Sequence, residues 1–211
     1  MEYKSRKLAT LDSNNLIAIL RPNGVKQKRA EACWLLAKRR EQKAIPALLR
    51  ALKDNEAEVR WEAAKALVAI SHPYSIRPLI QLMRHGKTTN IRQVAAYALS
   101  FMFSKRSKQA ARSLLSVLND KKEKAVVRAQ AAEGLGNLQY RPAFNSLMLA
   151  LHDKSVDVRF WSAFALGKLG DSMALPKLKE MAQHDSGVLP GWWSIQKEAR
   201  DAIRAINRKY S

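Results

Sequence analysis

Two kinds of apolar segment alternate along the chain. The longer segments place apolar and small residues at spacings of three and four, as in EVRWEAAKALVAI (58–70) and DVRFWSAFALGKL (157–169). Shorter apolar segments, such as IPALLRAL (45–52) and IRPLIQLM (76–83), lie between them. These spacings put the apolar residues on one face of a helix. The pattern therefore predicts a succession of short and long amphipathic helices joined by polar turns.

The pairing of a short helix with a long helix recurs through the sequence. Equivalent Val or Ile residues of the long segments follow one another at intervals of 31 to 37 residues: Val59, Ile91, Val127, Val158 and Ile195. A single pair has nowhere to bury its apolar stripe, so the pairs must stack. The sequence predicts an all-α protein, a right-handed α-solenoid of about six helix pairs. We expect a single domain, residues 1–211, with repeats at about 12–42, 43–72, 73–105, 106–139, 140–170 and 171–208.

The long segments share the motif V-R-x-x-A-A-x-A-L-G-x-L-G-D, followed by A-x-P-x-L. The fullest copies are VRFWSAFALGKLGDSMALPKL (158–178) and VRAQAAEGLGNLQYRPAF (127–144). The motif resembles short bacterial HEAT-like repeats, of the kind also called phycobilisome-lyase HEAT-like repeats. The resemblance covers about residues 12–208. It implies a solenoid fold and says little about function, because the motif residues build the stack.

The resemblance also implies structural roles for an arginine and a turn aspartate in each repeat. The matching arginines are Arg60, Arg92, Arg128 and Arg159, and the matching aspartates are Asp54, Asp120 and Asp153. We expect them to form a ladder of charge-assisted hydrogen bonds that holds neighbouring turns together. The turn HGKTTN (85–90) has no aspartate, so Arg92 is expected to be the free member.

Few residues point to catalysis or to a metal site. Cys33 is the only cysteine, and it falls at a packing position of the first long helix. The four histidines, His72, His85, His152 and His184, lie in predicted turns of different repeats. The HEAT-like hydroxylases bind iron through His-Glu dipeptides, which this sequence lacks. We expect no metal, no cofactor and no small-molecule substrate. With no signal-peptide or membrane-span pattern, a cytoplasmic setting is expected.

The long helices have one face that the packing stripe does not use. In the segment 58–70, positions 61, 62, 65 and 69 point away from the stripe of Val59, Ala63, Ala66, Leu67 and Ile70. Aromatic residues are concentrated at the equivalent positions, which would line the concave surface of a solenoid. Exposed aromatic clusters commonly mark interaction surfaces. The predicted partner-binding residues are Trp34, Lys38, Trp61, Lys65, Tyr97, Phe101, Phe160, Trp161, Phe164 and Lys168. The pair Trp192 and Trp193 fits a hydrophobic lid as well as a ligand contact.

Charge adds a second feature to this surface. The 211 residues carry a formal net charge of +20, and no acidic residue occurs between Ala63 and Asn119. Such an excess attracts an anionic partner. A basic patch is predicted in the turns of the first and third repeats, and we expect its residues on one edge of the concave surface: Arg39, Arg40, Lys43, Lys105, Arg106 and Lys108.

These features favour a non-enzymatic binding scaffold that holds an acidic protein partner on an aromatic and basic surface. Nucleic acid is the leading alternative partner, because aromatic rings interleaved with Lys and Arg also suit stacked bases. A third hypothesis is an enzyme or enzyme subunit similar to the bilin lyases or to the HEAT-like DNA glycosylases. No residue-by-residue match to either active site is present.

Overall fold

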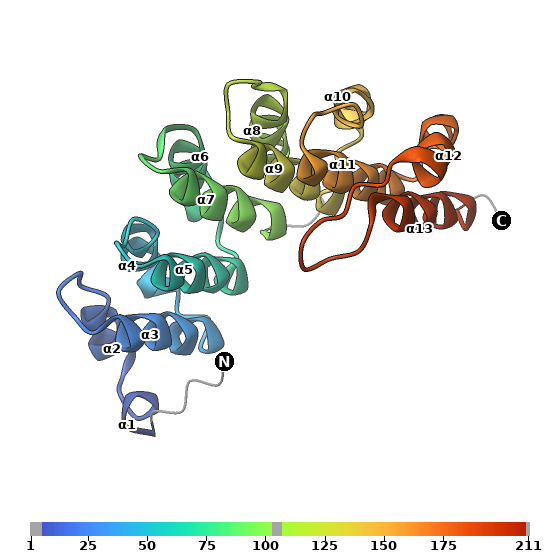
Figure 1. Cartoon of the computed structure of the whole chain (residues 1–211). Helices are drawn as coiled ribbons and strands as arrows, with labels where there is room; N and C mark the ends of the chain where they lie inside the picture. The colour runs from blue at the N-terminus through green and yellow to red at the C-terminus, as the bar shows by residue number, and fades with distance from the viewer. Residues whose placement is uncertain (1–5, 103–106, 210–211) are drawn as a thin grey trace. The chain divides into compact units, whose positions relative to one another are not determined.

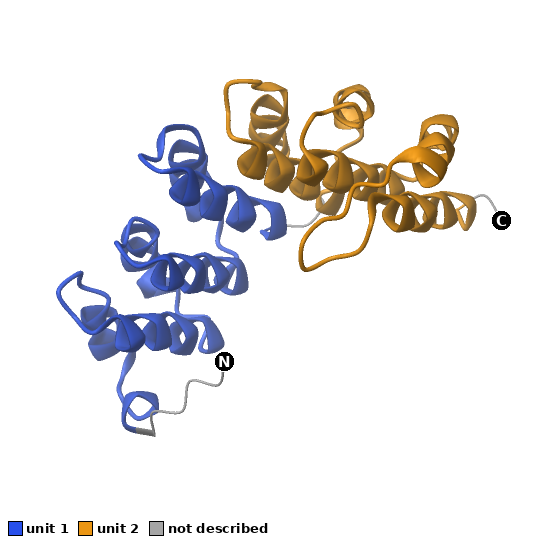
Figure 2. Ribbon diagram, in the orientation of Figure 1, with its two compact units in different colours: residues 1–102 blue, residues 103–211 orange. Residues whose placement is uncertain are grey.

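The regular structure of the chain is helical (Figure 1). The computed structural model describes residues 6–102 and 107–209, and it divides into two compact units, residues 1–102 and 103–211 (Figure 2). Over the described residues no strand forms, and Val188 and Ser194 make one isolated antiparallel bridge. None of the helices in these ranges combines the length and apolar character needed to cross a membrane.

Unit 1 contains three helix pairs after a single turn of helix, α1 (Arg6–Ala9). The short helices are α2 (Ser13–Ile19), α4 (Ile45–Ala51) and α6 (Ile76–His85). The long helices are α3 (Lys26–Lys38), α5 (Ala57–Ile70) and α7 (Thr89–Phe101). Helix α5 packs against both α3 and α7, so the long helices form one layer that the short helices cover on one side.

Unit 2 repeats this arrangement with three further pairs. The first helices of the pairs are α8 (Lys108–Asn119), α10 (Phe144–Ala150) and α12 (Leu175–His184). The long helices α9 (Ala125–Asn137), α11 (Val156–Leu169) and α13 (Ile195–Asn207) lie side by side, with α11 packed against both others. The prediction of an all-α stack of about six helix pairs is confirmed. The expected single domain stays a prediction.

Local sequence signals account for the helix ends. Asp12, Thr88, Ser107 and Ser194 cap α2, α7, α8 and α13 by accepting a backbone amide on a side-chain oxygen. Pro46 and Pro176 fall in the first turns of α4 and α12, where a missing N–H costs little. Helix α11 ends at Leu169 and is capped by Gly170, whose positive φ of 65° favours glycine.

Two glycines allow the long helices of unit 2 to approach closely. A Cβ atom at Gly136 of α9 would lie 2.7 Å from the Cα atom of Ala165 in α11. A Cβ atom at Gly167 of α11 would lie 2.8 Å from the Cα atom of Ala202 in α13. Both distances are shorter than real contacts of a Cβ atom, and the obstacle is backbone. The close packing of these helices therefore requires glycine at both positions.

We expect Gly136→Ala to lower the free energy of unfolding. The clash must push α9 from α11 at a cost of about 1–3 kcal/mol, which exceeds the gain of up to about 1 kcal/mol in helix propensity. Urea denaturation measures the difference. The control is Gly24→Ala, because the nearest atom to its added Cβ lies at an ordinary contact distance of 3.5 Å. Equal stabilities of the two variants would contradict the close-packing argument.

Candidate binding surface and the ladder beneath it

An arginine near the start of each of five long helices is bonded to the turn before its own helix. Its Nη1 atom donates to a main-chain carbonyl of that turn, at 2.6–2.9 Å for the arginines of α5, α7, α9 and α11. The donor and acceptor pairs are Arg29 and Gly24, Arg60 and Asp54, Arg92 and Gly86, Arg128 and Glu123, and Arg159 and Asp153. The arginine thereby fixes its helix to the preceding turn.

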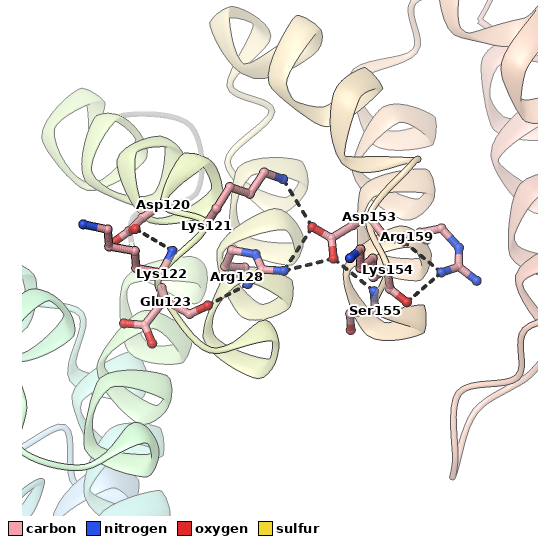
Figure 3. A network of polar contacts seen from close by, with 9 residues as sticks. All are labelled: Asp120, Lys121, Lys122, Glu123, Arg128, Asp153, Lys154, Ser155 and Arg159. Carbon is pink, nitrogen blue, oxygen red and sulfur yellow. Dashed lines mark hydrogen bonds and ion pairs between the residues drawn. The ribbon is translucent and has the colours of Figure 1, made fainter.

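In three cases the same guanidinium group also pairs with an aspartate in the next turn along the chain. Arg29 donates from Nε and Nη2 to the two carboxylate oxygens of Asp54, both at 2.9 Å. Arg159 does the same with Asp185, at 2.7 and 3.1 Å. Arg128 donates from Nη2 to both oxygens of Asp153, at 2.9 and 3.0 Å (Figure 3). We call these arginines and their acceptors the arginine ladder, and each pairing a rung.

Each ladder aspartate also organises its own turn. The Oδ1 atoms of Asp54, Asp153 and Asp185 accept the backbone amides of Glu56, Ser155 and Gly187 at 2.9–3.0 Å. Such a turn is a common role of aspartate. One carboxylate therefore closes its turn and holds the arginine of the previous repeat. The predicted ladder is confirmed in these rungs.

The ladder differs from the sequence prediction in its membership. Arg29 and Asp185 belong to it, although neither was among the matched residues. The signals were present, because KRAEAC (28–33) follows the motif and HDS (184–186) repeats the HDKS turn of 152–155. The expectation that Arg92 is free was wrong, because its Nη1 atom donates to Gly86 at 2.9 Å. Arg60 takes a neutral acceptor, the Oδ1 atom of Asn90, at 2.6 Å.

The ladder lowers the pKa of its carboxyl groups. Burial alone would raise the pKa of Asp153, but hydrogen bonds from the Ser155 amide and from Arg128 hold this pKa below its ordinary value. Burial would likewise raise the pKa of Asp185, but hydrogen bonds from Arg159 and from the Gly187 amide outweigh burial and lower it. Both carboxylates therefore favour the folded state while they are ionised.

We call the side of the long helices that the short helices do not cover the open side. Aromatic side chains form a row there in unit 1. The ring centroids of Trp61 in α5 and Tyr97 in α7 are 5.2 Å apart, and those of Tyr97 and Phe101 are 4.9 Å apart. Trp34 in α3 is 38% exposed, and the Nζ atom of Lys38 lies 5.4 Å from its ring centroid. The structure thus brings the predicted aromatic residues of α5 and α7 together and leaves them accessible.

Unit 2 has a larger aromatic cluster, made by α11 and the loop before α13. Trp161 contacts Phe164 and Trp192, with ring centroids 5.4 and 5.0 Å apart, and Trp192 contacts Trp193 at 5.4 Å. Trp192 and Trp193 remain 50% and 38% exposed. We define the unit 2 aromatic cluster as Phe160, Trp161, Phe164, Trp192 and Trp193. The loop tryptophans therefore both cover α11 and extend its exposed aromatic surface.

One predicted site residue lies in the core. Phe160 has no exposed surface, because the rings of Trp161, Trp192 and Trp193 lie within 6.0 Å of its centroid. Its role is to support the cluster, and the expectation that it points outward was wrong. The same correction applies to the position one residue further along the helix, which position 62 represents in the sequence prediction and which was also expected to point away from the packed stripe: Glu31, Glu62, Val94 and Gln130 are buried there. At these two early positions Trp61 and Trp161 stay partly exposed, and the later positions of these helices are partly or fully exposed.

Lysines flank the aromatic surfaces. Lys168 lies 5.3 Å from the ring centroid of Phe164, and Lys197 lies 4.0 Å from that of Trp193. Both distances suit a cation–π interaction. Lys65 is exposed on α5 and pairs with Glu62 at 2.8 Å. Each aromatic surface therefore carries positive charge at its margin.

The predicted basic patch is only partly described. Arg40, Lys43 and Lys108 are exposed. Arg39 is engaged by the chain itself, because it donates to the carbonyls of Leu11 and Ala9 at 2.8 and 2.9 Å. Lys105 and Arg106 lie outside the described residues.

Two carboxyl groups on the long helices of unit 2 have raised pKa values. Burial raises the pKa of Glu133 in α9 to about 7, against the opposing hydrogen bond from Gln130. Burial also raises the pKa of Glu198 in α13, which accepts the indole N–H of Trp193 at 2.8 Å. Sequence reasoning missed both, because their burial depends on the packing of neighbouring helices.

Comparison with known proteins decides the family. A sequence profile of HEAT repeats matches residues 13–100 and 109–189. The chain belongs to the HEAT repeat family. Among HEAT and armadillo structures, the complex of CpcE and CpcF of phycocyanin lyase from Nostoc sp. PCC7120 contains a chain that is 23% identical, with a TM-score of 0.59. That match covers 72% of this chain and 96% of the other.

Two further relatives show how widely this fold occurs. A designed armadillo repeat protein in complex with the peptide (KR)4 is 18% identical over 93% of this chain and 100% of its own, with a TM-score of 0.56. The deoxyhypusine hydroxylase of Drosophila melanogaster is 25% identical in an alignment 210 positions long. The alignment covers 84% of this chain and 68% of the hydroxylase.

The HEAT repeat chain does not gather metal-binding residues in the part that the structure describes. No group of three or more His, Cys, Asp or Glu side chains is placed to hold a metal ion there. Cys33 is buried, and desolvation, with the negative charges of Glu62 and Asp54, raises the pKa of its thiol. A thiol with a raised pKa is a poor nucleophile at neutral pH.

We expect Asp153→Asn to destabilise the protein by about 1–3 kcal/mol at neutral pH, because a neutral amide replaces a charge-assisted partner of Arg128. The lowered pKa of Asp153 stabilises the fold above the ordinary aspartate pKa of about 3.9 and ceases to do so as the pH falls through its folded value. The difference from wild type should therefore vanish in acid. Thermal unfolding across this pH range measures it. Asp171→Asn, in a turn without an ion pair, is the control.

Glu133 affects the pH dependence of stability in the opposite sense to Asp153, because its pKa is raised in the folded protein. We therefore expect Glu133→Gln to remove a loss of stability that wild type shows as the pH rises. The unfolded chain ionises Glu133 near the ordinary pKa of about 4.3, before the folded protein does, so wild-type stability falls as the pH rises from there through about 7. The free energy of unfolding of the variant, measured by urea denaturation, should match that of wild type near the lower pH of this range. It should exceed that of wild type at the upper pH. A profile parallel to that of wild type would contradict the raised pKa, and Glu180→Gln should leave the neutral range unchanged.

Proposed function

We propose that this HEAT repeat protein is a binding scaffold, and that the open side of its long helices holds an acidic protein partner. One observation carries the proposal. All five tryptophans of the sequence lie on the long helices or in the loop packed on α11: Trp34, Trp61, Trp161, Trp192 and Trp193. Tryptophan is strongly enriched among residues that dominate binding energy. Its restriction to this surface supports a role in recognition.

The charges favour an acidic partner. Lys38, Lys168 and Lys197 lie beside exposed rings of the two units, and the chain as a whole carries a formal charge of +20. An acidic segment that also carries apolar side chains would place its carboxylates on the lysines of one unit and its apolar groups on the rings beside them. Electrostatic complementarity of this kind raises the association rate and selects against basic partners.

The relatives support protein recognition as the class of function. The designed armadillo repeat protein holds a basic peptide, and CpcE and CpcF form a complex with one another. The hydroxylase relative is an enzyme, but the His-Glu dipeptides that the HEAT-like hydroxylases use for iron do not occur in this sequence. These features together favour binding over catalysis.

The experiment uses a fluorescein-labelled peptide in which glutamates alternate with leucine and phenylalanine. The double variant Trp161→Ala with Trp192→Ala should weaken its binding at least about 30-fold, as expected when hot-spot side chains are removed. Fluorescence anisotropy measures the Kd. Tyr74→Ala is the matched control, because Tyr74 is 65% exposed but lies beside a short helix.

Wild-type affinity in the double variant would contradict the proposal, and loss of helicity would return the two tryptophans to a structural role. Single-stranded DNA is the competing probe. If it binds while the peptide does not, and log K falls with log salt at a slope of about −0.7 per phosphate, the partner is a nucleic acid.

A further inference from the structure

Consecutive turns of the stack leave grooves between them, and one in unit 1 is about twice the size of two others in the described part of the chain. A groove of about 1030 Å³ lies in unit 1 between the α4–α5 turn and the α6–α7 turn. The corresponding groove between the α2–α3 and α4–α5 turns has about 500 Å³, and one beside Asp185 in unit 2 has about 430 Å³. We call the large one the Arg60 groove, because Arg60 forms part of its wall.

The ladder rung at the Arg60 groove is incomplete. Arg60 donates from Nε to the Oδ1 atom of Asn90 and from Nη1 to the carbonyls of Asp54 and Asn55. An amide offers one oxygen where a carboxylate offers two. In the described part of the chain, the Nη2 atom of Arg60 therefore has no acceptor, whereas Nη2 of Arg29, Arg128 and Arg159 each meets a carboxylate oxygen.

The lining of the Arg60 groove is strongly cationic. Arg50 and Lys53 from the end of α4 and Lys87 from the α6–α7 turn join Arg60 there. All three are exposed, and none makes an ion pair with a described residue. The only carboxylate among the described lining residues is Asp54, which Arg29 already holds. By contrast, the groove at Asp185 balances Arg159 and Lys177 with Glu180 and Asp185.

We propose that the Arg60 groove is a second docking site, in which a carboxylate of an acidic protein segment completes the rung by accepting from Nη2 of Arg60. It deepens the proposed function and rests on it for the nature of the partner. The carboxylate would take the place that aspartate fills in the complete rungs, with Lys53 and Lys87 close to the rest of the segment.

The lining favours a protein segment over a nucleic acid. Leu49, Pro78 and Leu82 are partly exposed in the groove and offer apolar contacts to side chains next to the carboxylate. The described lining holds no Trp, Tyr or Phe side chain on which a base could stack, and its one ring is the imidazole of His85. Binding of single strands usually depends on such rings.

The decisive variant fills the site from within. Asn90→Asp supplies the missing carboxylate in cis, so we expect a higher Tm than wild type and binding of a labelled oligo-glutamate peptide weakened by about tenfold, the loss expected for one charged hydrogen bond. Fluorescence anisotropy at low salt measures the affinity. The peptide has no apolar side chains, so it has little to gain from the aromatic surfaces. Asn145→Asp, exposed on α10, makes the same change of charge and should leave both quantities near their wild-type values.

Lys87→Ala provides a second variant that does not touch the ladder, and it should also weaken the peptide. The groove proposal is overturned if wild type does not bind oligo-glutamate, or if Asn90→Asp and Asn145→Asp weaken its binding equally. It is also overturned if Asn90→Asp weakens the binding of single-stranded DNA but not the binding of the peptide. The groove is supported if Asn90→Asp weakens binding of oligo-glutamate and the double variant Trp161→Ala with Trp192→Ala binds it as wild type does. The reverse result overturns the groove and leaves the proposed function standing.

Discussion

A guanidinium group shared between two consecutive turns sets how neighbouring repeats meet within a unit. Its Nη1 atom holds the turn before its own helix, and in the three carboxylate rungs its Nη2 atom, joined by Nε in Arg29 and Arg159, reaches the aspartate that closes the following turn. Side chains in stacked repeats contact only near neighbours, so a directional contact of this kind supplies what apolar packing alone does not, a fixed register. The close approach of Gly136 to Ala165 and of Gly167 to Ala202 depends on that register.

The regular ladder also explains where the surface can vary. Alanine, glycine and buried polar residues occupy the positions that pack between long helices. Tryptophan, phenylalanine and lysine occupy positions that remain partly or fully exposed. The rung at Arg60 departs from the pattern, and a groove of about 1030 Å³ lies there. Variation in a repeat protein is informative where a structural position has lost its usual partner.

The sequence predicted the helix pairs and most of the ladder because both recur. Periodicity places Val59, Ala63 and Leu67 on the packed stripe, and all three are buried. Prediction was weaker where a contact depends on one repeat alone. Phe160 and Trp61 occupy equivalent positions, yet only Phe160 is fully buried, because the loop bearing Trp192 and Trp193 covers it. The path of that loop, and the use of Asn90 within α7 as the acceptor in place of a turn aspartate, have no counterpart in the other described repeats.

The central claim is that the open side of the long helices is a recognition surface for an acidic protein segment. An NMR titration of the 15N-labelled protein with the glutamate, leucine and phenylalanine peptide tests it most directly, because the five indole N–H signals all report from that side. The indole signals of Trp61, Trp161, Trp192 and Trp193 should shift, while the amides of the exposed residues Leu149 and Met173, which belong to α10 and the turn before α12, should not. Shifts confined to the short helices, with unchanged indole signals, would contradict the account.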